Sequence, residues 1–235
     1  MRRLIPLLLA VLLLPSLASA RLEAGLGLSL GWPTGEFKDE VEFAWGGGGR
    51  AGWSFGGVSP VKATIFFDVN YLNYGRERRT EPFSYTIPDV TVDVVTDNYL
   101  MHFSPGISVG RSHGVIRPYA EVFGGVTYIA TKTKIENRNL PDEPIAESTN
   151  FNDYAFNFGF GSGLKFRLWQ SPVSVPSVDI REVLLDLKFG YIKGGEAEYL
   201  KKGSIERLNN ASISYDTINS ATDIVQARIG VYLLF

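Results

Sequence analysis

The chain has 235 residues, a formal net charge of −2 and no cysteine. Without cysteine it has no disulfides, no thiolate nucleophile and no thiolate metal site. Its balanced charge, with no basic tail or large basic cluster, argues against nucleic acid as a partner. We expect no cofactor and no metal; the glycine run at 46–49 lacks the Lys-Ser/Thr ending of a phosphate-binding loop.

Residues 1–20 have the pattern of a secretory signal peptide. Met1-Arg2-Arg3 precedes an apolar run from Leu4 to Leu17, and Ala18-Ser19-Ala20 fits a small-residue cleavage site. The run is shorter than the ~20 apolar residues of a membrane-spanning helix, and two prolines interrupt it. We therefore expect a cleaved signal peptide over 1–20 and one domain over 21–235, a common length for a single all-β domain.

Alternation of apolar and polar residues with a period of two predicts eight strands in the remaining chain. The clearest is the sixth, in which Phe156, Phe158 and Phe160 alternate with Asn157 and Gly159. We expect no helix and no second domain. The predicted strands are Leu22–Trp32, Glu42–Gly56, Val61–Tyr71, Asn98–Val109, Ala120–Tyr128, Tyr154–Leu168, Glu182–Tyr191 and Val225–Phe235.

The composition of the two strand faces decides which face points inward. The apolar faces carry large aromatic side chains, whereas the opposite faces combine glycine with charged residues. A soluble lipocalin-like barrel, the alternative, would be overfilled by these aromatic faces. Apolar residues facing lipid, with glycine and charge facing the lumen, are typical of transmembrane barrels, and closure satisfies every backbone group internally. The sequence thus predicts an eight-stranded antiparallel up-and-down transmembrane β-barrel.

The last strand resembles the sorting signal by which bacterial outer-membrane barrels are recognised for insertion. Alternate residues are apolar back from the terminal aromatic, and the predicted signal comprises Ile229, Val231, Leu233 and Phe235. The resemblance implies the bacterial outer membrane as location, and the barrel-assembly machinery and periplasmic chaperones as partners during biogenesis. We expect a monomer.

Link lengths and aromatic positions predict the orientation. Links after the second and fourth strands are short, and those after the first, third, fifth and seventh are longer. Short periplasmic turns alternating with long external loops are the rule for this architecture, so both termini are predicted to be periplasmic. The predicted aromatic girdle beside the long loops comprises Trp32, Trp45, Tyr71, Tyr99, Tyr128, Tyr154 and Tyr191.

Across nearly its whole mature length the chain resembles the small OmpA-type or opacity-like outer-membrane barrels. The residues that carry the likeness are Arg117–Gly125, Phe156–Phe166 and the terminal strand. Gly194–Gly203 is also similar to segments of uncharacterised members. The resemblance implies a fold and a location, and no specific activity.

Eleven charged residues are predicted to face the lumen, which in an eight-stranded barrel is just wide enough for side chains. Because isolated buried charges are costly, we expect them to form a salt-bridge network that closes the barrel, with a small porin or gated channel as the alternative. Arg228 is expected to pair with a residue such as Glu23 of the adjoining first strand. The predicted network comprises Glu23, Arg50, Lys62, Asp68, Glu121, Lys165, Arg167, Glu182, Asp186, Lys188 and Arg228.

An enzyme is the more distant alternative. Outer-membrane lipid A deacylases carry a His-x-Ser pair, and His102-Phe103-Ser104 has that spacing. However, Pro105 follows where that family has Asn, and the register turns both side chains into the lumen. We therefore predict no catalytic residues and a structural or surface-interaction role exercised through the external loops.

Three arginines cluster just beyond Tyr71, at the predicted outer rim. Arg76, Arg78 and Arg79 are hypothesised to contact phosphates of lipopolysaccharide, with a solvated loop as the alternative. Outer-membrane lipid and lipopolysaccharide are therefore the expected lasting partners.

Overall fold

The computed structural model describes residues 21–56, 60–84, 87–137, 140–171, 180–207 and 213–235. The predicted signal peptide, residues 1–20, lies outside this part of the chain. The elements in chain order are β1 (Arg21–Pro33), α2 (Phe37–Glu40), β2 (Ala44–Phe55), β3 (Val61–Ser84), β4 (Ile87–Arg111), β5 (Ile116–Asn137), β6 (Leu140–Gln170), β7 (Glu182–Gly194), β8 (Glu196–Arg207), β9 (Ile213–Ala221) and β10 (Ile224–Leu234).

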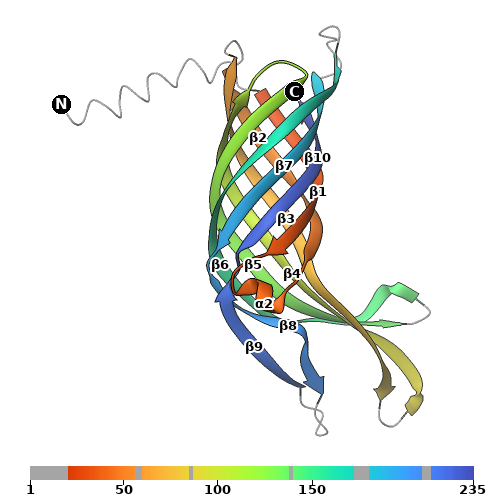
Figure 1. Cartoon of the computed structure of the whole chain (residues 1–235). Coiled ribbons are helices and arrows are strands. Elements are labelled where there is room, and N and C mark those ends of the chain that lie inside the picture. The colour runs from red at the N-terminus through yellow and green to blue at the C-terminus, as the bar shows by residue number, and fades with distance from the viewer. Residues whose placement is uncertain (1–20, 57–59, 85–86, 138–139, 172–179, 208–212) are drawn as a thin grey trace, which may run out of the picture.

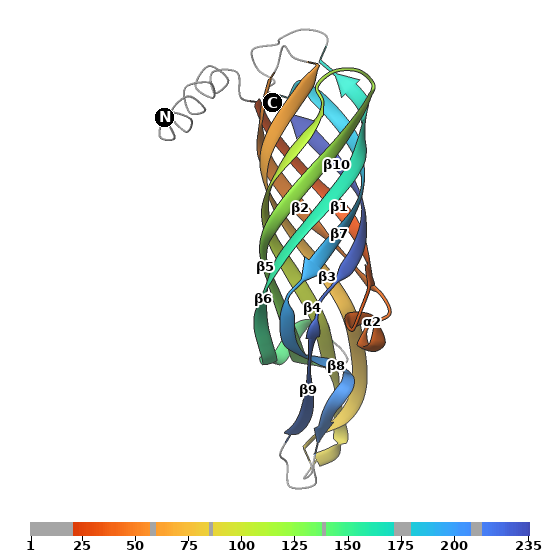
Figure 2. The same ribbon diagram turned by 60° about the vertical axis from the view of Figure 1, so that its left-hand side comes forward.

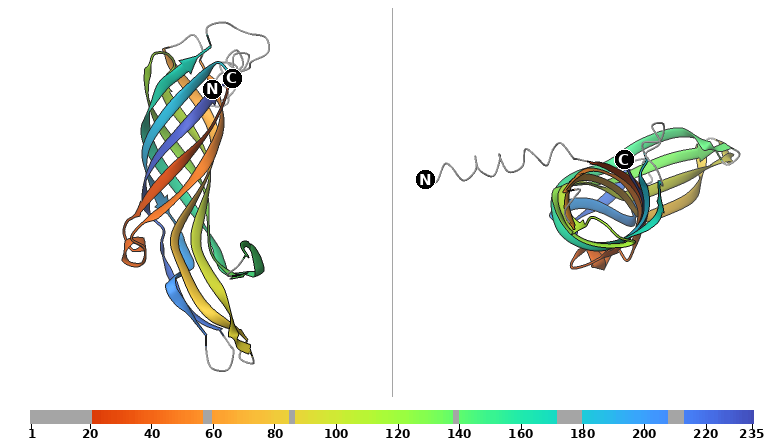
Figure 3. Two further views of the ribbon diagram at one scale, coloured as in Figure 1. Left: turned by 90° about the vertical axis from the view of Figure 1, so that its right-hand side faces the viewer. Right: turned by 90° about the horizontal axis from the view of Figure 1, so that it is seen from above.

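Eight strands form a closed barrel in the order β1-β10-β7-β6-β5-β4-β3-β2 (Figures 1 and 3). All neighbours are antiparallel, and β1 closes the ring by pairing with β10 from Glu23↔Leu234 to Pro33↔Ile224. The predicted eight-stranded antiparallel barrel is confirmed.

The outer surface of the barrel is apolar, as the strand periodicity predicts. On β1, Leu26 and Leu28 are 75% and 70% exposed, whereas Glu23 and Ser29 are buried inside. On β6, Phe156 is 82% exposed. A continuous exposed apolar surface of this kind is unsuited to water and matches the lipid-facing band of a transmembrane barrel. Among the described residues, no helix has the length and apolar character needed to cross a membrane.

Both ends of the described chain lie at the end of the barrel where β2 leads to β3, β4 to β5 and β6 to β7 (Figures 1 and 3). The β6–β7 link, residues 171–181, is longer than the other two, as its sequence indicates. We call this the terminal end. The opposite end, the hairpin end, carries α2, the long β3–β4 and β5–β6 hairpins and the separate two-stranded sheet β8–β9 (Figure 2).

The hairpin end differs most from the sequence prediction. β3 and β4 continue past the predicted Tyr71 and Asn98 limits, and β5 and β6 continue past Tyr128 and Tyr154. Beyond the rim β3, β5 and β6 carry polar residues on both faces, so the alternation that marks a strand is lost although backbone pairing continues. β4 keeps the alternation at Val90, Val92 and Val94, which the prediction did not assign to a strand. The long last link contains β8 and β9, and the short helix α2 corrects the expectation of no helix.

Gly125 shows how closely the strands of the barrel approach each other. A Cβ atom at this position would lie 1.9 Å from the carbonyl oxygen of Phe103 on β4. At the adjacent Gly124 the nearest atom would be 3.5 Å away, an ordinary van der Waals contact. Only glycine therefore fits at Gly125 without movement of the backbone.

We predict that Gly125→Ala destabilises the barrel by about 1–3 kcal/mol, the usual cost of overpacking, because the β4–β5 backbone must shift. Gly124→Ala is the matched control and should retain the stability of the unmodified chain. The measurement is the urea midpoint for loss of the fast-migrating band on unboiled gels. Equal midpoints for the two variants would contradict the prediction.

Candidate functional site

The lumen is the candidate site, because inward side chains from all eight strands converge there. From the terminal end to the hairpin end we distinguish four layers. The terminal cluster contains Glu23, Lys62, Lys165, Arg117, Arg167 and Glu182; the central cluster contains Arg50, Asp68, Glu121, Lys188 and Arg228. The polar layer contains Ser29, Asn70, His102, Ser104, Thr127, Asn157 and Gln226, and an apolar plug follows it.

The central cluster links five buried charges from five strands, each at most 7% exposed. Arg50 on β2 donates from Nη1 to Glu121 Oε2 at 2.6 Å and from Nε to Asp68 Oδ2 at 2.8 Å. Lys188 Nζ lies 3.0 Å from Glu121 Oε1, and Arg228 Nη1 lies 2.9 Å from Asp68 Oδ2. Each carboxylate therefore receives at least two cations, which offsets the cost of its burial.

The partner of Arg228 is Asp68, and the expected pairing of Arg228 with Glu23 is wrong. On the β1–β10 ladder Arg228 stands opposite Ser29, six residues along the strand from Glu23. At ~3.4 Å per residue their backbone positions are about 20 Å apart along the seam. Arg228 instead reaches across the lumen to β3.

The terminal cluster has four cations for two carboxylates. Glu23 binds Lys62 and, at 2.9 Å, Lys165. Arg117 donates hydrogen bonds to the Glu182 carboxylate from Nη1 at 2.6 Å and from Nη2 at 2.9 Å. Arg167 lies farther from Glu182, at 3.9 Å. The excess of positive charge is therefore concentrated near the terminal end.

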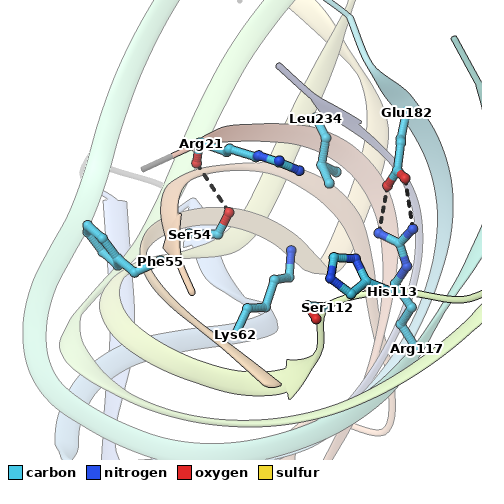
Figure 4. Close-up of a pocket in the computed structure, with 9 residues that line it drawn as sticks. All are labelled: Arg21, Ser54, Phe55, Lys62, Ser112, His113, Arg117, Glu182 and Leu234. Carbon is cyan, nitrogen blue, oxygen red and sulfur yellow. Dashed lines mark hydrogen bonds and ion pairs between the residues drawn. The ribbon is translucent and has the colours of Figure 1, made fainter. Parts of the chain in front are cut away.

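A cavity of about 30 Å³ opens beside this cluster (Figure 4). Figure 4 shows the Lys62 side chain extending into it between Ser54 and Ser112, with the Arg117–Glu182 pair along one wall. About 10–15 Å³ of such volume accommodates one water molecule, so this cavity holds two or three.

Asp186 departs from the predicted network. Its Oδ2 accepts a hydrogen bond from the Tyr119 hydroxyl at 3.0 Å, and its Oδ1 is buried without a partner. No cation lies within 4.0 Å of this carboxylate among the described residues. The structure thus places ten of the eleven predicted charges in ion pairs and leaves Asp186 bonded to a phenol.

The sequence reasoning missed Arg117, which falls in a predicted turn, and four aromatic side chains that face inward, namely Phe66, Tyr119, Phe123 and Tyr232. The Arg50 guanidinium lies 3.8 Å from the centroid of Phe66, and Lys165 Nζ lies 4.6 Å from that of Tyr232 and 5.4 Å from that of Tyr119. These rings fill the lumen and attract the cations through their π-faces. The sequence held one signal for two of them: Phe66 on β3 and Tyr232 on β10 occupy alternate positions that face the lumen.

In the polar layer His102 and Ser104 each hydrogen-bond to a different partner. His102 Nδ1 lies 2.9 Å from Thr127 Oγ1, and Ser104 Oγ donates to Asn157 Oδ1 at 3.4 Å. Both residues are buried in the lumen rather than exposed to lipid, and no carboxylate hydrogen-bonds His102 among the described residues. The geometry lacks the nucleophile–base contact that hydrolysis requires.

The apolar plug lies at the hairpin end of the lumen. The ring of Phe37, from α2, makes edge contacts with Tyr74 and Tyr199 at centroid distances of 5.8 and 5.3 Å. Tyr199, from β8, is 1% exposed, and its burial raises its pKa. The plug comprises Phe37, Val41, Ala44, Leu72, Leu100, Ile129, Ala155, Ala197, Tyr199 and Ile224, with Tyr74 and Ile218 packed against it.

On the outside, four of the predicted girdle residues form a continuous row across β3–β6. Centroid distances are 5.2 Å for Tyr71–Tyr99, 6.2 Å for Tyr99–Tyr128 and 4.9 Å for Tyr128–Tyr154. The others stand apart from this row: Trp32 contacts Phe43, Tyr191 contacts Phe160, and Trp45 is 61% exposed.

The arginines beyond Tyr71 lie on β3, not in a loop, and they divide between its two faces. Arg76 and Arg78 continue the face of the tyrosine row and contact Asp97 at 3.4 Å and Glu136 at 2.7 Å. Arg79 lies on the opposite face, 2.9 Å from Glu77. The register adds Lys132 and Lys134 of β5 to the outer face.

The residues of the predicted insertion signal lie on β10 and at its end. Ile229 and Val231 are 50% and 45% exposed on the outer face. Leu233 lies on the same face, and the Phe235 amide donates to the Leu22 carbonyl at 3.0 Å, which extends the β1–β10 seam by one bond.

We predict that Asp68→Asn destabilises the barrel by about 3–5 kcal/mol, because it leaves Arg50, Lys188 and Arg228 sharing one carboxylate in a buried site. Arg167→Ala removes a cation whose side chain is 29% exposed and should cost less than about 1 kcal/mol. Urea-induced unfolding in lipid vesicles measures both. A loss of less than about 1 kcal/mol for Asp68→Asn would contradict the assigned role of the central cluster.

No protein-family model and no curated protein sequence matches the chain. Among solved structures it is similar to Neisserial surface protein A, at 12% identity and a TM-score of 0.43, over 91% of this chain and 97% of that one. It is similar to Ail, the attachment invasion locus protein of Yersinia pestis, at 12% identity and a TM-score of 0.37, over 92% and 97%. A third is a major outer membrane protein of Thermus thermophilus, at 11% identity and a TM-score of 0.40, over 92% and 100%. The likeness concerns the fold alone, and the eight-stranded ring of this chain rests on its own strand order.

Proposed function

We propose that this chain is a non-enzymatic outer-membrane barrel protein of the OmpA-type or opacity-like kind, with a closed lumen and a role at the cell surface. The proposal of a closed lumen is supported by side chains that obstruct it at two levels. Five paired charges fill its centre, and the plug around Phe37 and Tyr199 covers its hairpin end. The cavities of about 30 and 10 Å³ have room for a few water molecules and for one, which is too little for a hydrated ion path.

The hairpin end is the proposed external side. The termini and short turns would then face the periplasm, in keeping with the architecture of such barrels. The projecting β3–β4 and β5–β6 hairpins offer the largest surface beyond the membrane, and a surface role would be exercised there. During biogenesis, the exposed face of β10 would be recognised by the barrel-assembly machinery and periplasmic chaperones.

Lipopolysaccharide is the proposed lasting partner of the outer hairpin face. Arg76 and Arg78 stand immediately beyond the tyrosine row, with side chains 60% and 52% exposed. Lys132 and Lys134 follow on the same face of β5. Phosphate groups at the headgroup level would meet these cations, in competition with Asp97, Glu136 and Glu147. Arg79, which faces the other way, is omitted from the contact.

We predict that the refolded protein shows no stepwise conductance in a planar bilayer, because both levels of the lumen are filled. Phe37→Ala combined with Tyr199→Ala should remain silent, because the central cluster still blocks the path. Reproducible steps from the unmodified protein, abolished by Arg50→Ala or Glu121→Ala, would instead establish the small channel.

For lipopolysaccharide, we predict that Arg76→Ala with Arg78→Ala lowers the amount that co-purifies by at least about tenfold, because two charge-assisted contacts are lost. Arg79→Ala, one residue away on the opposite face, is the matched control and should retain binding. Unchanged co-purification with the double variant would rule out the proposed contact.

A further inference from the structure

A small cavity of about 10 Å³ lies in the polar layer, next to the central cluster. Its wall includes Asn70 from β3, His102 from β4 and Gln226 from β10, each at most 4% exposed. Lys188 and Asp68 of the central cluster also line it. The volume corresponds to one small occupant.

Three buried polar atoms on this wall have no hydrogen-bond partner within the protein. They are Asn70 Nδ2, His102 Nε2 and Gln226 Nε2. Buried polar groups in folded proteins are almost always hydrogen-bonded, so an isolated exception calls for a local explanation. All three belong to residues that line the same cavity, so one occupant there could pair with them.

The surrounding hydrogen bonds give Asn70 Nδ2 and His102 Nε2 donor roles once one direction is assigned. Asn157 Nδ2 donates to Thr127 Oγ1 at 2.9 Å, and we assign the Thr127 hydroxyl as the donor to His102 Nδ1, also at 2.9 Å. The neutral imidazole then carries its hydrogen on Nε2. Asn70 Oδ1 accepts from Ser29 Oγ at 2.9 Å, which fixes Nδ2 as the free end of that amide.

The charges beside the cavity favour an anion. Arg50, Lys188 and Arg228 bring three positive charges to the two negative charges of Asp68 and Glu121. Asp68, the carboxylate on the cavity wall, has both oxygens occupied, by Arg50 Nε at 2.8 Å and by Arg228 Nη1 at 3.0 Å. Its repulsion of a neighbouring anion is therefore offset by these cations.

We propose that this cavity is a binding site for one monovalent halide, chloride under ordinary conditions, held by N–H groups of Asn70, His102 and Gln226. A halide accepts hydrogen bonds from several directions and donates none. A water molecule accepts two and must place its own two hydrogens against acceptors. The halide also balances the excess positive charge of the central cluster, so that the closed interior includes an ion as a structural part.

Crystals of the refolded chain grown with bromide in place of chloride test this directly. The expected result is one anomalous bromine peak inside the barrel, within hydrogen-bond distance of His102 Nε2, Asn70 Nδ2 and Gln226 Nε2. A fully occupied water at that position, with no anomalous signal in bromide-grown crystals, would overturn the proposal. The outcome is independent of any surface role.

A solution measurement compares thermal unfolding in chloride, bromide and gluconate at equal ionic strength, since gluconate is too large for the cavity. The unmodified chain should unfold at a higher temperature in either halide than in gluconate. Asn70→Leu should lose this difference, whereas Asn98→Leu should retain it, because Asn98 is a buried amide that bonds Thr131 outside the cavity. Equal midpoints in the three salts, or the same halide effect in both variants, would contradict the site.

Discussion

Closure of eight strands into a ring is the constraint on which the rest of this structure depends. The seam between β1 and β10 removes the last sheet edge, so the backbone is satisfied without water and the outer surface is free to be apolar. The same closure fixes a lumen just wide enough for side chains. The charges placed there are buried, so leaving them unpaired would be costly.

The inward charges meet this requirement because cations and carboxylates share partners. Asp68 and Glu121 each bind at least two cations, and Arg50 joins the two carboxylates. Aromatic rings such as Phe66 and Tyr232 fill the space that the ion pairs leave and face the cations. Where glycine lines a strand, as at Gly125, it admits the neighbouring backbone rather than a side chain. Ion pairs, aromatic rings and close backbone approach at glycine therefore fill the narrow interior together.

The sequence predicts the ring and the direction of most side chains well, because a period of two survives wherever one face meets lipid. It also identifies the inward charges from Glu23 on β1 to Arg228 on β10. It does not predict their pairing, since partners across the lumen depend on strand tilt and stagger rather than on neighbouring register. Adjacency of strands alone pairs Arg228 with β1, whereas in the structure it bonds Asp68 on β3. The hairpin end is predicted poorly, because above the rim β3, β5 and β6 are polar on both faces and Phe37 lies in a helix of four residues. The short alternations at Val90–Val94 and Glu196–Tyr199 were not assigned to strands.

Closure of the lumen to solutes from both sides can be measured directly, because the chain has no cysteine. Ser29 is fully buried in the polar layer and differs from cysteine by one atom, whereas Ser148 is exposed on the projecting part of β6. Labelling of Ser29→Cys and Ser148→Cys in sealed vesicles by a charged, membrane-impermeant thiol reagent compares the two sites. A closed lumen predicts labelling of Ser148→Cys and none of Ser29→Cys from either side of the membrane. Rapid labelling of Ser29→Cys in the folded barrel would contradict it.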